Sequence, residues 1–92
     1  MYGVFILEEA LEDLTTIVAH ISAENVAAAE TLGNELIDDA MTLEMMPYRG
    51  SVVTKQPALR KLIHGNYLVY YRTKEAEKAV EIVSFIHSAQ IK

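Results

Sequence analysis

The chain has 92 residues, a formal net charge of −5 and no cysteine. That length suits one domain with a single hydrophobic core. Without cysteine the chain forms neither disulfides nor thiolate metal sites, and no apolar run approaches the roughly 20 residues that span a bilayer. An acidic isoelectric point near 5 disfavours a nucleic-acid binder, because phosphate contacts come from Lys and Arg. The first residues lack a basic segment, so we expect no signal peptide.

The first half predicts one strand and two helices. Residues 2–7 are β-branched and aromatic, which is typical of a short buried strand. From Glu8 to about Ala23 the apolar residues recur at helical spacing. Asn25 is a suitable N-cap for a second helix, which ends before Pro47. The predicted buried stripes are Leu11, Leu14, Ile17, Val18 and Ile21 in the first helix, and Val26, Ala29, Gly33, Leu36, Ile37, Ala40 and Leu43 in the second.

The second half predicts strands. Gly65-Asn66 is a two-residue hairpin signal, Pro57 restricts the segment before it to a sheet edge, and a polar loop at 73–78 leads to the last strand. The strands expected are 51–56, 58–64, 67–72 and 79–87.

The order of elements, β-α-α-β-β-β, predicts an α+β fold. A two-helix hairpin would pack on one face of a small, mainly antiparallel sheet. We expect a single domain over residues 1–92, with the strand and an acidic helical hairpin in 1–48 and a basic β-meander in 49–92.

Charge follows the same division. Residues 1–48 contain no Lys or Arg, whereas residues 49–92 contain all eight together with three Glu, so the halves carry about −10 and +5. This division predicts two surfaces with different partners. The basic residues are Arg49, Lys55, Arg60, Lys61, Arg72, Lys74, Lys78 and Lys92.

The hairpin also predicts which side chains share a face of the sheet. One face carries Leu59, Lys61, Ile63, Leu68, Tyr70 and Arg72. We expect it to be the core face, because its apolar residues are contiguous. The other face would then be a recognition surface, and a register shift of one residue would exchange the two. That second face carries Arg60, Leu62, His64, Tyr67, Val69 and Tyr71.

Several short motifs follow one another over residues 10–90. In this order and spacing the chain resembles the RelE/ParE toxin superfamily. The resemblance implies the same β-α-α-β-β-β fold, a cytoplasmic location and a cognate antitoxin that wraps its C-terminal segment around the toxin. The motifs are Ala10-x-x-Asp13-Leu14, Ile17 with Ile21, Pro47-x-x-Gly50, Leu59-Arg60-x-Leu62, Tyr67-Leu-Val-Tyr-Tyr71, Val80-x-Ile82 and His87-Ser88-Ala89-Gln90.

The superfamily has two mechanisms. RelE-like members cut mRNA on the ribosome, and ParE-like members, the plasmid-stabilisation toxins, poison DNA gyrase. RelE-like nucleases carry an Arg directly before the Leu-Val-Tyr of the middle strand, where this chain has Tyr67. The ending at His87 resembles the ParE-like His-x-Ala-Arg, with Gln90 in the arginine's place.

We therefore expect a ParE-like toxin that inhibits growth by binding a protein target, DNA gyrase, and that is neutralised by an antitoxin, as a homodimer or a hetero-oligomer with it. One alternative is a RelE-like, ribosome-dependent mRNA endoribonuclease. Another is a non-toxic, degenerate member that keeps only partner binding, since Gln90 lacks the family's cation.

Few residues are candidates for chemistry. RNA cleavage without a metal needs a base, an acid and cations for the phosphorane charge, for which Arg60, His64 and His87 are available. The three histidines lack ligand spacing, so we expect no metal site, and no Gly-rich loop indicates a phosphate cofactor. The target-binding candidates are Arg60, Tyr67, Tyr71, His87 and Gln90.

Overall fold

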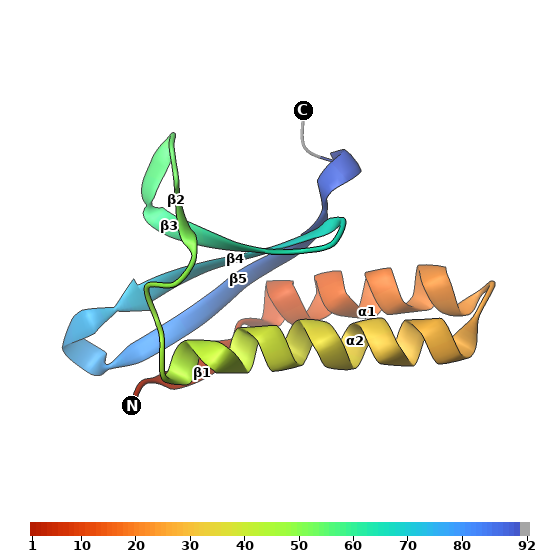
Figure 1. Cartoon of the computed structure of the whole chain (residues 1–92), viewed down its shortest axis with the longest axis horizontal. Coiled ribbons are helices and arrows are strands. Elements are labelled where there is room, and N and C mark those ends of the chain that lie inside the picture. Colours follow the sequence, from red (N-terminus) through yellow and green to blue (C-terminus); the bar gives the residue numbers. More distant parts are fainter. Residues whose placement is uncertain (91–92) are drawn as a thin grey trace.

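The computed structural model describes residues 1–90, without the side chain of Gln90, as a five-stranded sheet with two helices on one face (Figure 1). The strand order is β1-β5-β4-β3-β2. β1 is parallel to β5, and the other neighbours are antiparallel. The predicted α+β fold is therefore confirmed. The elements are β1 (Gly3–Ile6), α1 (Glu8–Ser22), α2 (Val26–Met41), η1 (Thr42–Glu44), β2 (Ser51–Val53), β3 (Gln56–His64), β4 (Tyr67–Lys74), η2 (Glu75–Glu77), β5 (Ala79–His87) and η3 (Ser88–Gln90).

The element ends follow local chemistry. The side chain of Asn25 accepts a hydrogen bond from the Ala28 backbone N at 2.9 Å, so the predicted N-cap of α2 is confirmed. Gly65 has a φ of 58°, a left-handed conformation that suits the two-residue turn between β3 and β4. The expected strand at 51–56 is shorter than predicted and ends at Val53, where the pairing with β3 shifts register.

The hydrophobic core lies between the helices and the face of the sheet that they cover, here called the inner face. The prediction of burial is wrong for two residues of the stripes, since Leu11 is 52% exposed and Val26 is 61% exposed. Val26 begins α2 beside the helix–helix turn, which lies beyond the sheet in Figure 1, so no strand covers it. The core comprises Ala10, Leu14, Leu36, Ala40, Leu43, Leu62, Val69, Tyr71, Val80, Ile82 and Phe85.

The predicted register of the hairpin is confirmed, but the assignment of its faces is wrong. Leu62 pairs with Val69 as expected, yet Leu62 is 4% exposed and Val69 is fully buried. Ile63, expected in the core, is 67% exposed. Both faces of the hairpin carry contiguous apolar residues. The helices cover the face on which Leu62 and Val69 lie, and Val80 of β5 joins the same core. The other side of the sheet is here called the outer face.

A bulge in β5 keeps its apolar residues on the inner face. The pairing of β4 with β5 shifts between Tyr70 and Tyr71, so that Val83 is left between two registered pairs. Asp13 of α1 accepts hydrogen bonds at this point from the Ser84 hydroxyl at 2.9 Å and the Phe85 backbone N at 3.3 Å. The helix thereby fixes the irregular part of the strand.

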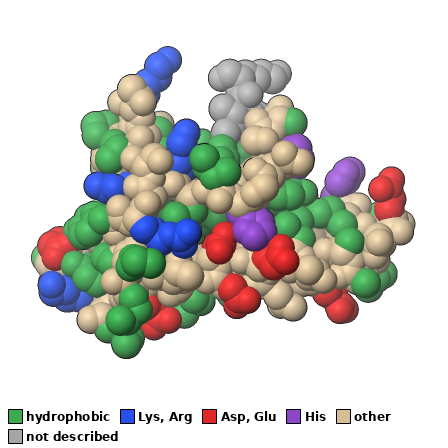
Figure 2. Space-filling view, viewed as in Figure 1, with side chains coloured by type: hydrophobic (Ala, Val, Ile, Leu, Met, Phe, Trp, Pro, Cys, Tyr) green, Lys and Arg blue, Asp and Glu red, His purple; other side chains and the backbone are tan. Residues whose placement is uncertain are grey.

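Charges follow the two layers, as Figure 2 shows on one side of the molecule. Lys and Arg side chains lie mainly over the strands and their loops, and Asp and Glu side chains lie mainly along the helices. Opposite charges also meet within the sheet layer, where Arg72 contacts Glu81 at 2.6 Å and Lys78 contacts Glu75 at 3.4 Å. Among residues 1–90 no helix combines the length and the apolar character needed to cross a membrane.

Candidate functional site

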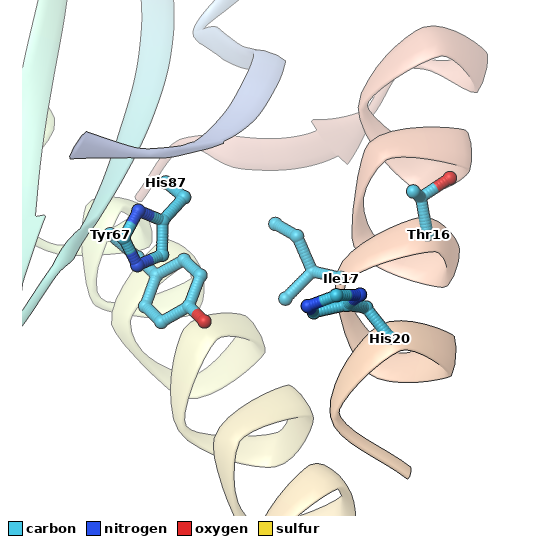
Figure 3. Close-up of a pocket in the computed structure, with 5 residues that line it drawn as sticks. All are labelled: Thr16, Ile17, His20, Tyr67 and His87. Carbon is cyan, nitrogen blue, oxygen red and sulfur yellow. The ribbon is translucent and has the colours of Figure 1, made fainter. Parts of the chain in front are cut away.

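A hollow of about 350 Å³ opens between α1 and the end of the sheet (Figure 3). Thr16, Ile17 and His20 line it from the helix, and Tyr67 and His87 line it from the strands. Tyr67 begins β4 and His87 ends β5, and the two are registered partners. Their rings meet edge to face, with centroids 4.9 Å apart and planes at 87°. The predicted residues Tyr67 and His87 therefore form one aromatic pair.

Aromatic rings and one aliphatic side chain form most of the lining of the hollow. Nδ1 of His87 accepts a hydrogen bond from the Ala89 backbone N at 3.1 Å, so the neutral ring carries its proton on Nε2. The other lining residues are Thr16, Ile17, His20 and Tyr67. An apolar or aromatic group fits such a lining.

His64 joins the sheet to α2. Its Nδ1 lies 2.7 Å from an Asp39 carboxylate oxygen, and its Nε2 lies 3.0 Å from a Glu35 carboxylate oxygen. Glu35 and Asp39 stand four residues apart and share one face of the helix. The two carboxylates favour the imidazolium, in which both ring nitrogens donate, and they raise the pKa of His64, with the hydrogen bond to Glu35 as the largest cause. His64 thus links the inner face of the sheet to α2.

We expect the contribution of the charged His64 ring to stability to decrease as the pH rises. When folding raises the pKa of a group, the charged group stabilises the folded protein. This stabilisation is complete below the pKa of the unfolded state, about 6.5 for His, and is lost as the pH rises through the pKa of the folded state. Urea unfolding of the native chain and of His64→Gln, at about pH 6 and about pH 9, measures the difference in their free energies of unfolding. The difference in free energy of unfolding should shrink at the higher pH, and Asp39→Asn should weaken this dependence. An unchanged difference would mean that folding does not raise the pKa of His64.

Arg60 and Tyr71 hold the segment before β2. The Arg60 guanidinium donates to the Tyr48 carbonyl at 3.1 Å and to the Gly50 carbonyl at 2.8 Å. It also lies over the Tyr48 ring, 5.1 Å from the centroid. The Tyr71 hydroxyl accepts a hydrogen bond from the Gly50 backbone N at 2.9 Å. Tyr71 has no exposed surface, so its predicted contact with a target is not supported, and Arg60 does not point outward as expected.

Glu75 anchors a second cluster, which the sequence did not indicate. Its carboxylate accepts hydrogen bonds from the Tyr48 hydroxyl and, at 2.6 Å, from the Tyr2 hydroxyl. Both bonds lower the pKa of Glu75, and the carboxylate raises the pKa of Tyr48 to about 12. The Lys78 ammonium lies 3.4 Å from the same carboxylate. The cluster joins residues that lie far apart in the sequence, so no local pattern could predict it.

The outer face of the sheet carries a shallow apolar hollow of about 280 Å³. Its lining has no charged side chain and includes Leu59, Tyr70 and Ile86. In Figure 1 the β2–β3 arm and the C-terminal end of β5 rise on either side of the sheet. An apolar floor between raised sides is typical of a surface that receives another polypeptide.

The chain lacks the donor set of a metal centre within the part that the structure describes, where no group of three or more His, Asp or Glu residues could hold an ion. His20 and His87 line the same hollow, and His64 faces the acidic residues of α2. The side chain of Gln90, a predicted target-binding residue, lies outside the described part.

Comparison with known proteins decides the family. Residues 4–92 match the family model described as ParE toxin of type II toxin-antitoxin system, parDE. The chain belongs to the ParE toxin family. This ParE-family protein is therefore a toxin of a type II toxin–antitoxin system, and the superfamily predicted from sequence is confirmed. No curated protein matches its sequence.

Three solved structures share the fold of this ParE-family toxin. The chromosomal ParDE system from P. aeruginosa is 18% identical, with a TM-score of 0.81 over 95% of this chain and 96% of that chain. The RelBE2 toxin–antitoxin complex from Mycobacterium tuberculosis is 22% identical, with a TM-score of 0.69 over 94% and 96%. The isolated E. coli RelE toxin is 14% identical, with a TM-score of 0.64 over 100% and 89%. At these identities the similarity shows the fold alone.

Proposed function

We propose that this ParE-family toxin inhibits growth in the cytoplasm by binding a protein target, DNA gyrase, and that a cognate antitoxin neutralises it. The observation that carries the proposal is the separation of the three nuclease candidates. Arg60 and His64 are four residues apart on β3, so their Cα atoms are about 13 Å apart along the strand. His64 and His87 lie on the two strands that flank Tyr67, so their Cα atoms are about 10 Å apart across the sheet.

The contacts of these residues support the same conclusion. A base, an acid and a cation must all reach one phosphate within hydrogen-bonding distance. Here the Arg60 guanidinium binds two backbone carbonyls and the His64 ring binds two carboxylates. Each group already has a structural role at its own place in the fold. This arrangement favours a binding protein over an endoribonuclease.

The outer face is our proposed target-binding surface. Its most exposed apolar side chain, Ile63, lies on the same face of β3 as Leu59, which lines the hollow together with Tyr70. Nearby charge is limited, because Arg72 is paired with Glu81 and Lys61 is half-buried. Apolar surface with few charges suits a protein partner better than a phosphate backbone.

Two assays run side by side test the target. The purified toxin should inhibit DNA supercoiling by gyrase and leave ribosome-bound mRNA intact. Cleavage of mRNA with normal supercoiling would instead identify a RelE-like nuclease. No effect in either assay would identify a member that retains partner binding without toxicity.

A pair of variants tests the surface. Ile63→Asp should weaken gyrase inhibition by about tenfold or more, because a charge introduced into an apolar contact typically costs over 1 kcal/mol. Val26→Asp is the matched control, since Val26 is similarly exposed, at 61%, at the start of α2. Equal inhibition by the two variants would contradict the proposed surface.

The antitoxin completes the proposal. The M. tuberculosis RelBE2 structure and the intact E. coli RelBE structure are both toxin–antitoxin complexes. The E. coli complex is 16% identical, with a TM-score of 0.61 over 92% of this chain and 94% of that chain. We propose the same kind of partner here. An equimolar amount of the cognate antitoxin should restore supercoiling in the gyrase assay.

A further inference from the structure

The two edges of the sheet are protected to different extents. β2 forms one edge, and it has only three residues and an irregular register; Lys55 lies in the turn that follows it, and Pro57 lies near the start of its partner β3. Short length, irregularity, Lys and Pro all discourage pairing with another strand. β1 forms the other edge, and its residues Gly3–Ile6 include neither a charge nor a proline. No strand within residues 1–90 lies beyond β1.

Among residues 1–90, no backbone partner is found for several polar groups of β1 along this edge. The Gly3 N–H donates to the Lys78 carbonyl at 2.9 Å, and the Leu7 N–H donates to the Ile82 carbonyl at 3.0 Å. Because successive residues of a strand alternate in direction, Val4 and Ile6 direct their N–H and C=O groups away from β5. The Tyr2 N–H also points that way, but it donates to the Glu44 carbonyl at 2.9 Å. The open stretch is therefore Val4 to Ile6.

A large aromatic side chain lies at the centre of that stretch. Phe5 is 57% exposed on the outer face. Its ring lies back over Gly3, where an added Cβ would meet the ring at 3.0 Å. Val4 and Ile6 instead pack against the core. The edge thus combines four unpaired backbone groups with one exposed aromatic ring.

We propose that a second copy of the chain pairs with β1 in antiparallel orientation, about a two-fold axis at Phe5. In this register Val4 exchanges two hydrogen bonds with Ile6 of the second copy, and Ile6 exchanges two with its Val4. The two Phe5 residues then form a non-hydrogen-bonded pair with Cα atoms about 4.5 Å apart. Aromatic rings at such positions stabilise antiparallel strands. The result is a continuous ten-stranded sheet across the dimer.

Symmetry and geometry favour this register over its neighbours. An axis at Val4 would oppose Ile6 to Tyr2 of the second copy, whose N–H is already bonded to Glu44. An axis at Ile6 would oppose Val4 to Glu8 of the second copy, which is already helical. Only the axis at Phe5 gives both open residues an open partner. A contact this short is expected to be weak and to depend on concentration, as transient interfaces do.

Cysteine trapping tests the register. The chain has no cysteine, so Phe5→Cys introduces a single thiol, and Cα atoms about 4.5 Å apart suit a disulfide. Mild oxidation should convert most of this variant to a covalent dimer. Val52→Cys is the control, because Val52 is also exposed, at 46%, on the opposite edge strand, and it should stay mostly monomeric. Equal cross-linking of the two variants would overturn the proposal.

A charge exchange tests the symmetry. Phe5→Lys and Phe5→Glu should each sediment as folded monomers where the native chain dimerises, because each would face its own charge across the axis. Their equimolar mixture should recover the dimer. Failure of the mixture to recover it overturns the Phe5–Phe5 contact. A native chain that stays monomeric, with β1 amides protected from exchange only after the antitoxin is added, would assign the edge to the antitoxin instead. Neither result depends on the gyrase assay.

Discussion

Replacing Gly50 with Ala is expected to destabilise the fold by about 3 kcal/mol or more. A Cβ at this position would lie 2.6 Å from the Lys61 carbonyl oxygen and 2.8 Å from the Tyr71 hydroxyl. The backbone at Lys61 pairs with Ser51 in the β2–β3 ladder, so it has little freedom to move. Any shift of Gly50 also weakens its bonds to Tyr71 and Arg60.

Urea unfolding of Gly50→Ala beside Gly65→Ala measures the effect. Gly65 has a φ of 58° and no atom within 4 Å of an added Cβ, so its replacement costs only the strain of the left-handed backbone, about 1–2 kcal/mol. The two variants separate close packing from conformational strain. If Gly50→Ala loses no more stability than Gly65→Ala, the segment around Gly50 is able to rearrange.

Replacing Leu36 with Ala should cost about 2–5 kcal/mol, because it leaves a cavity in the core. Leu36 has no exposed surface and packs between α2 and the inner face of the sheet. Val26→Ala on the same helix is the control, and its exposed side chain predicts a change within about 0.5 kcal/mol. Thermal unfolding of both variants checks the expectation. Equal losses of stability in the two variants would mean that α2 is not packed tightly against the sheet at Leu36.

The sequence predicted what local interactions determine. The N-cap at Asn25 and the turn at Gly65 each depend on residues within a few positions, and both are confirmed. The register of the hairpin follows from its turn. These features are independent of how the helices and the sheet pack.

The faces of the sheet could not be predicted in the same way. Leu62 and Ile63 are equally apolar neighbours, and only the packing of α1 and α2 decides that Leu62 is buried. The candidate site changed with the faces. Arg60 was expected on the outside, but on the inner face it binds the carbonyls of Tyr48 and Gly50. The acidic partners of His64 come from a helix far away in the sequence, so its role needed the tertiary structure.

The parallel pairing of the first strand with the last has a consequence for biosynthesis. Among residues 1–90, Gly3–Ile6 pair within the chain with residues 79–82 alone, so the first strand made must wait for the last. A nascent chain that still has its final strand inside the exit tunnel cannot close the sheet, and contacts of such long sequence separation form slowly. β1 therefore joins the sheet only after residues 79–82 have left the ribosome, so closure of the sheet is a late step in folding.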